Sequence, residues 1–82
     1  MKKGIIVDDA TVMRLRLREI LEKKYEVVGE AEDGKQALSL YLAKKPDFIT
    51  LDITMPHVDG LEALSLILSA DPDAKVVIVS AV

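Results

Sequence analysis

Aspartates stand at positions where apolar runs of this sequence end. Asp8 and Asp9 come directly after one such run, and Asp52 directly follows a second. Ser80 ends a third run. If these runs are parallel strands of one sheet, their side chains gather at one edge, because the carboxyl ends of parallel strands meet there. Crowded carboxylates repel one another, and a cation or a proton relieves that repulsion.

Oxygen ligands in a chain with no cysteine and a single histidine suit a hard divalent cation, and Mg²⁺ in particular. A magnesium ion beside a carboxylate offers a route to phosphoryl transfer. The metal neutralises charge on the transferring group while a carboxylate oxygen attacks in line, which gives an acyl phosphate. The hydroxyl of Ser80 can then donate a hydrogen bond to the phosphoryl oxygens.

A structural interpretation of the same aspartates stays open. Aspartates at strand ends are common as turn formers and helix caps, and Asp9 lies two residues before an expected helix. Any one of them taken alone is more often structural, whereas their joint placement at two strand ends is a rarer coincidence. The glycines are too scattered for a phosphate-binding glycine-rich loop.

Strand-like and helix-like segments alternate along the chain and position these residues. Apolar, β-branched runs predict strands at 4–7, 25–31, 47–51 and 75–80. Helical spacing of apolar residues predicts helices from 11 to about 24, from 34 until Pro46, and from 60 until Asp71. This alternation is typical of a parallel α/β sheet.

The composition narrows the class of protein further. With 82 residues, 50% of them hydrophobic, the chain suits one globular domain. Its net charge of -3 gives no electrostatic reason to expect nucleic acid or an anionic membrane as a partner. It has no cysteine and no apolar run of the roughly 18 residues that a membrane helix needs. We therefore expect a cytoplasmic protein.

Four blocks of the sequence together resemble one known family. They are residues 5–14 (IIVDDATVMR), 29–38 (GEAEDGKQAL), 47–60 (DFITLDITMPHVDG) and 76–81 (VVIVSA). The combination is similar to bacterial response-regulator receiver domains of the single-domain chemotaxis type, over the whole chain. The resemblance implies a flavodoxin-like, doubly wound parallel α/β sheet with strand order 2-1-3-4 and three helices. It also implies that residues 1–82 are a single receiver-like domain that lacks helix 4, strand 5 and helix 5.

The resemblance also implies a role for each residue of the acidic site. Asp52 matches the phosphoacceptor, which receives a phosphoryl group from a histidine kinase or a small phosphodonor. Asp9 matches a direct Mg²⁺ ligand, and Asp8 one that acts through a metal-bound water. Thr54 matches the position whose backbone carbonyl coordinates the metal.

The remaining family positions concern the phosphoryl group and the loop. Ser80 matches the hydroxyl that hydrogen-bonds the phosphoryl group, and Ala81 the small residue that leaves space for it. Pro56 and Gly60 shape the loop between the third strand and third helix. The family's catalytic lysine on strand 5 has no counterpart here. Lys75 begins the fourth strand and is expected at the wrong end of the sheet to replace it.

Two functions from different classes remain open at this point. One is a phosphoacceptor module of two-component signalling that is not an enzyme beyond self-phosphorylation, and that truncation impairs. The other is a non-signalling flavodoxin-like fragment or scaffold whose main property is self-association. An acetyl phosphate reaction distinguishes them.

The expected partners are a histidine kinase and a second copy of the chain. In the family, helix 1 is a docking surface for the kinase, and here it carries Arg14, Arg16 and Arg18. A solvated basic face is the more ordinary explanation of these arginines. The edge of strand 4 and the sheet face that no helix covers predict a homo-oligomer. The lone His57 is expected to be a solvent-exposed loop residue.

Overall fold

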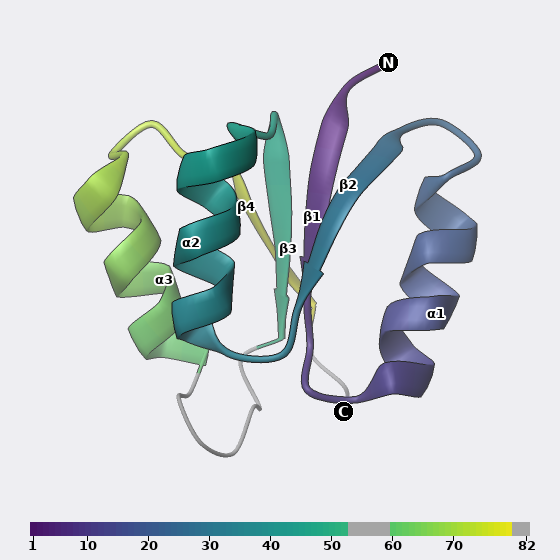
Figure 1. The fold of residues 1–82 in the computed structure, drawn as a ribbon, viewed down its shortest axis with the longest axis horizontal. Coiled ribbons are helices and arrows are strands. Elements are labelled where there is room, and N and C mark those ends of the chain that lie inside the picture. The colour runs from purple at the N-terminus through teal and green to yellow at the C-terminus, as the bar shows by residue number, and fades with distance from the viewer. Residues whose placement is uncertain (53–59, 80–82) are drawn as a thin grey trace.

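The computed structural model describes residues 1–52 and 60–79, in which strands and helices alternate (Figure 1). The elements are β1 (Lys3–Val7), α1 (Thr11–Leu21), β2 (Glu26–Ala31), α2 (Gly34–Lys44), β3 (Phe48–Asp52), α3 (Gly60–Ala70) and β4 (Val76–Val79). All three strand pairings are parallel, and the order across the sheet is β2-β1-β3-β4. The predicted fold class and strand order are confirmed.

The helices lie on both faces of the sheet. Helix α1 packs on β1 and β2 from one side, while α2 and α3 contact each other on the opposite side (Figure 1). Right-handed crossovers give this division, because the chain moves from β1 outward to β2 and then back past β1 to β3 and β4. The core between the sheet and the α2–α3 layer is made of buried side chains that include Ile5, Val7, Ile49, Leu51 and Ile67.

Helix α1 begins at Thr11, as predicted, but ends earlier than predicted. The extended residue before the helix, Ala10, occupies the N-cap, and no side chain caps it. The helix ends at Leu21 and not near residue 24. Ile20, near the end of the helix, is exposed. No helix among the described residues is long and apolar enough to cross a bilayer.

Polar side chains fix helix α2 at its start and near its end. The Oδ1 atom of Asp33 accepts a hydrogen bond of 2.9 Å from the backbone N–H of Gln36, which caps the helix. Near the other end, Tyr41 donates its hydroxyl to Oδ2 of Asp71 at 2.6 Å. Burial, together with this bond and the Asp71 charge, raises the pKa of Tyr41 to about 12. The Tyr41–Asp71 bond ties α2 to the turn that follows α3.

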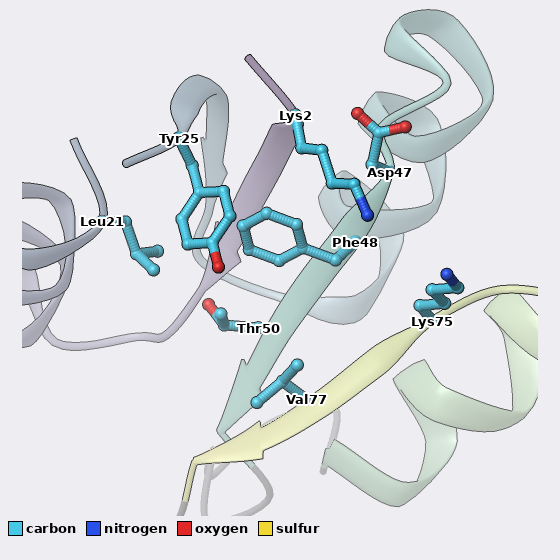
Figure 2. A pocket seen from close by; sticks show the side chains of 8 residues that line it. All are labelled: Lys2, Leu21, Tyr25, Asp47, Phe48, Thr50, Lys75 and Val77. Atoms are coloured by element: carbon cyan, nitrogen blue, oxygen red, sulfur yellow. The ribbon is translucent and has the colours of Figure 1, made fainter. Parts of the chain in front are cut away.

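Helix α1 contacts β1 and β2, and the same face of β3 and β4 is only partly uncovered. Figure 2 shows the side chains around a hollow of about 350 Å³ there, between the end of α1 and strands β3 and β4. Phe48 packs edge-on against Tyr25, with ring centroids 5.0 Å apart, and its ring occupies the space that a Cβ at Gly4 would need. Thr50 is buried, whereas Val77 on β4 is 50% exposed. The expectation of a bare face is therefore wrong for β3 and correct at Val77.

Candidate metal centre

The carboxyl ends of β1 and β3 bring three carboxylates together. Val7 pairs with Leu51 in the parallel register of these neighbouring strands, so Asp8 and Asp52 each follow a paired residue at the same edge. Carboxylate oxygens of Asp8, Asp9 and Asp52 all lie within 4.8 Å of one another. The sequence predicted this cluster from the positions of the strand ends alone.

Asp8 is buried and hydrogen-bonded. Asp8 is only 3% exposed and Asp52 is 6% exposed, whereas Asp9 is exposed. The backbone N–H of Asp8 donates to the carbonyl oxygen of Ala31 at 3.0 Å, which extends the β1–β2 ladder by one residue. The Oδ1 atom of Asp8 accepts a 2.9 Å hydrogen bond from the N–H of Ala10. The turn after β1 thus holds the carboxylate in place.

Burial raises the pKa of the Asp8 carboxyl above its ordinary value, and it is the largest influence. The bond from the Ala10 N–H lowers the pKa in part, while the negative charges of Asp52 and Asp9 raise it further. A raised pKa at Asp8 is the behaviour expected of a carboxylate in a site that a cation can neutralise.

A pH dependence of stability follows for the metal-free protein. Because the pKa of Asp8 is raised on folding, its contribution to the free energy of unfolding is fully present below the unfolded pKa of 3.8. That contribution is lost as the pH rises through the higher folded-state pKa. We expect urea unfolding in a chelator, measured at a series of pH values, to show this loss in the parent chain. Asp8→Asn should lack it, and parallel pH profiles for the two proteins would contradict the assignment.

The donor set fits a hard divalent cation. All three ligand candidates are carboxylates, two of them are mostly buried, and the chain has no cysteine to favour a softer metal. Magnesium commonly binds through a few carboxylates and keeps several waters, so one exposed ligand such as Asp9 suits it. The acidic cluster, meaning Asp8, Asp9 and Asp52, is thus chemically suited to Mg²⁺.

Of the other residues discussed for the site, the structure describes only Gly60 and Lys75. Gly60 is the buried first residue of α3, directly after the loop it was expected to shape. Lys75 precedes β4 and lies near Lys2 and Asp47 at the amino end of the sheet, away from the acidic cluster (Figure 2). Predictions for the remaining residues lie outside the described part of the chain; these residues are Thr54, Pro56, His57, Ser80 and Ala81.

The sequence interpretation missed the burial of Arg14. A solvated basic face was the more ordinary explanation for the three arginines of α1, yet Arg14 is only 8% exposed. It pairs with Glu30 of β2 at 3.1 Å, and Arg18 also pairs with Glu30, at 2.7 Å. Their spacing of four residues, which places both on one side of the helix, was the available signal. Arg16 is exposed, as expected.

Comparison with known proteins agrees with this arrangement. The family model of the response regulator receiver domain matches residues 5–82. The chain is 46% identical over 82 residues to the chemotaxis protein CheY of Thermotoga maritima, covering 99% of this chain and 68% of that protein. It is 52% identical over 83 residues to CheY of Listeria monocytogenes, covering all of this chain and 70% of that protein.

Solved structures give the same result. A CheX–CheY–BeF₃–Mg²⁺ complex from Borrelia burgdorferi matches with a TM-score of 0.93 and 34% identity, covering 99% of this chain and 63% of that one. The Thermotoga maritima response regulator TrrA, in complex with Mg²⁺ and BeF, matches with a TM-score of 0.91 and 37% identity, over 100% and 71% of the chains. The chain thus spans about two thirds of the length of these relatives. It belongs to the response regulator receiver domain family, and within it resembles the chemotaxis-type receivers of two-component signalling.

Proposed function

We propose that this chain is a phosphoacceptor module in which Asp52 receives a phosphoryl group in a magnesium-dependent reaction. The observation that carries the proposal is the acidic cluster, with its carboxylate oxygens within 4.8 Å at the carboxyl edge of β1 and β3. Support also comes from the two relatives whose solved complexes contain Mg²⁺ and a beryllium fluoride. Asp8, Asp9 and Asp52 would hold the ion, together with the backbone carbonyl of Thr54.

The chemistry assigned to Asp52 is a nucleophilic substitution at phosphorus. A carboxylate oxygen of Asp52 forms the new P–O bond, while the bond from phosphorus to the donor's oxygen or imidazole nitrogen breaks and its electron pair leaves with the donor. Magnesium, when bound, neutralises charge on the phosphoryl oxygens. The turn at Ala10 fixes the Asp8 carboxylate beside the nucleophile. Once Asp52 carries the phosphoryl group, the hydroxyl of Ser80 is proposed to donate a hydrogen bond to it. The small side chain of Ala81 is proposed to leave space for it.

Acetyl phosphate tests this function without a kinase. We expect the 82-residue chain, incubated with acetyl phosphate and Mg²⁺, to gain about 80 Da by intact-protein mass spectrometry. A longer receiver treated in parallel gives the reference rate. We propose that residues 1–82, as one receiver-like domain, react more slowly than the longer receiver. The reason is that Lys75, at the amino end of the sheet, cannot replace the catalytic lysine of the family beside the phosphoryl group. No adduct under conditions that label the reference would contradict the proposal.

The proposed phosphodonor in the cell is a histidine kinase that contacts helix α1. The outer side of this helix offers Arg16 together with the exposed apolar side chains of Val12 and Leu15. Apolar side chains beside a cation suit a helical partner with its own apolar and acidic residues. The ion-paired Arg14 and Arg18 face β2 and are not part of this contact surface.

We also propose that the 82-residue chain self-associates through β4, which is the alternative function of a scaffold. Strand β4 lies at the edge of the sheet, and its four residues carry no charge. Val77 is 50% exposed and Ile78 is 44% exposed, on opposite faces of that strand. A strand edge is complementary to another strand edge, so a second copy related by a two-fold axis is the occupant that fits it.

A charge on β4 should therefore prevent association. We expect Ile78→Lys to weaken self-association at least about tenfold, because burying a Val or Ile side chain contributes about 1.5–3 kcal/mol and an unpaired buried charge is unfavourable. Leu42→Lys, at a comparably exposed position on α2, is the control and should leave association unchanged. Light scattering at high micromolar concentration measures both. A parent chain that remains a 9.0 kDa monomer would contradict the scaffold function.

A further inference from the structure

We propose that Arg14 is a positioning residue for the acidic cluster and sets the affinity of that cluster for Mg²⁺. This inference rests on the proposed metal site and concerns a residue outside it. Arg14 lies on α1 and contacts the turn that carries Asp8 and Asp9. It is buried, at 8% exposure, which is unusual for a cation unless its charge and its N–H groups are satisfied.

The closest contact of Arg14 is with the backbone of Asp8. Its Nη1 atom donates a 2.6 Å hydrogen bond to the carbonyl oxygen of Asp8, and this bond is buried. A hydrogen bond from a charged donor is stronger than one between neutral groups, and its geometry is better defined. It holds the peptide that joins Asp8 to Asp9, and both of these residues supply carboxylates to the cluster.

Arg14 also fixes the remainder of the turn. Its Nη2 atom donates to the hydroxyl of Thr11 at 3.3 Å. The backbone N–H of the same residue, which every variant at this position keeps, donates to the carbonyl oxygen of Ala10 at 3.1 Å. The N–H of Ala10 in turn donates to Oδ1 of Asp8 at 2.9 Å. Arg14 is thus connected, by its own bonds and through Ala10, to the backbone and the carboxylate of Asp8.

The positive charge of Arg14 is matched by glutamates that are not part of the acidic cluster. Its Nε atom donates to Oε1 of Glu30 at 3.1 Å, and Nη2 lies 3.6 Å from Oε1 of Glu32. The guanidinium therefore contacts a carbonyl oxygen of Asp8 while two glutamates balance its charge. This arrangement fixes the ligand geometry and leaves the negative charge of the cluster for a metal cation.

Arg18 provides a matched control for the test. Its Nε atom donates to Oε2 of the same Glu30 at 2.7 Å, so Arg18→Gln and Arg14→Gln each remove one ion pair with Glu30. Only Arg14→Gln also removes the bond to the Asp8 carbonyl. Calorimetric titration with Mg²⁺ should show an affinity about tenfold weaker for Arg14→Gln, whereas Arg18→Gln should stay within about twofold of the parent. A merely structural role would lower the melting temperature of both variants and leave the affinity of the folded protein unchanged.

Amide hydrogen exchange gives a second readout that needs no metal. In metal-free protein, Arg14→Gln should accelerate exchange at the N–H of Ala10 about tenfold, because the turn that holds its bond to Asp8 is loosened. Arg18→Gln should not do so. Arg14→Lys keeps the charge but cannot bridge the Asp8 carbonyl and Glu30 with one ammonium, so intermediate values are expected. This variant also serves if Arg14→Gln does not fold.

Arg14 variants with parent Mg²⁺ affinity and parent exchange at Ala10 would overturn the inference. A parent chain that binds no Mg²⁺ would instead contradict the proposed metal site. In that case the exchange rates alone decide whether Arg14 positions the turn.

Discussion

Asp52→Asn is expected to abolish phosphoryl acceptance by this chain. The substitution keeps the shape of the side chain at the end of β3 but replaces the attacking carboxylate oxygen with a poorly nucleophilic amide. The mass increase of about 80 Da from acetyl phosphate should therefore disappear completely. Asp73→Asn is the control, because it removes the same charge from an exposed turn after α3. An Asp52→Asn protein that is labelled like its parent would show that another residue accepts the phosphoryl group.

Asp9→Ala is expected to weaken Mg²⁺ binding by about a hundredfold, since the number of charged oxygen ligands tunes the affinity of such sites over several decades. Asp9 is exposed, so the fold should tolerate the change better than a substitution at buried Asp8. Asp47→Ala changes the net charge equally, but Asp47 lies at the opposite end of the sheet, where Oδ2 accepts a bond from the Lys3 N–H. Its Mg²⁺ affinity should equal that of the parent in the same titration. Unchanged affinity in Asp9→Ala would remove this residue from the metal site.

The alternation of strands and helices could be predicted from features that are local in sequence, whereas the strand order rested on the resemblance to receiver domains, and the acidic cluster follows from the two together. Continuous apolar runs identify strands that are buried on both faces, and crossover handedness restricts their order. Once β1 and β3 are neighbours in a parallel sheet, Asp8 and Asp52 must lie at the same edge. No knowledge of side-chain packing is needed for that step.

Side-chain burial was less predictable, because it depends on which element packs against each helix face. Ile20, Leu42 and Leu61 fit the helical apolar pattern but are exposed, since the sheet covers only one side of each helix. Arg14 shows the opposite error. Its burial depends on Glu30, which β2 places beside α1, and on the Asp8 carbonyl. Both partners become apparent only in three dimensions.

The open face of the sheet shows a similar limit. A period-two pattern places alternate side chains of β3 on one face, but it does not show that the Phe48 ring lies across Gly4 and against Tyr25. That packing covers part of a face that the sequence pattern alone predicts to be bare. The prediction is correct at Val77, which is 50% exposed although it lines the same hollow as Tyr25 and Phe48.

Peptide mapping of the phosphorylated chain is the most direct test of Asp52 as a magnesium-dependent phosphoacceptor. The chain is treated with acetyl phosphate in Mg²⁺ or in a chelator, and borohydride then reduces any aspartyl phosphate to homoserine, which marks the modified residue. We expect the mark at Asp52, in the sample with Mg²⁺ and not in the chelated one. A mark at a different residue, or equal marking of Asp52 in the chelator, would contradict the function assigned to the acidic cluster.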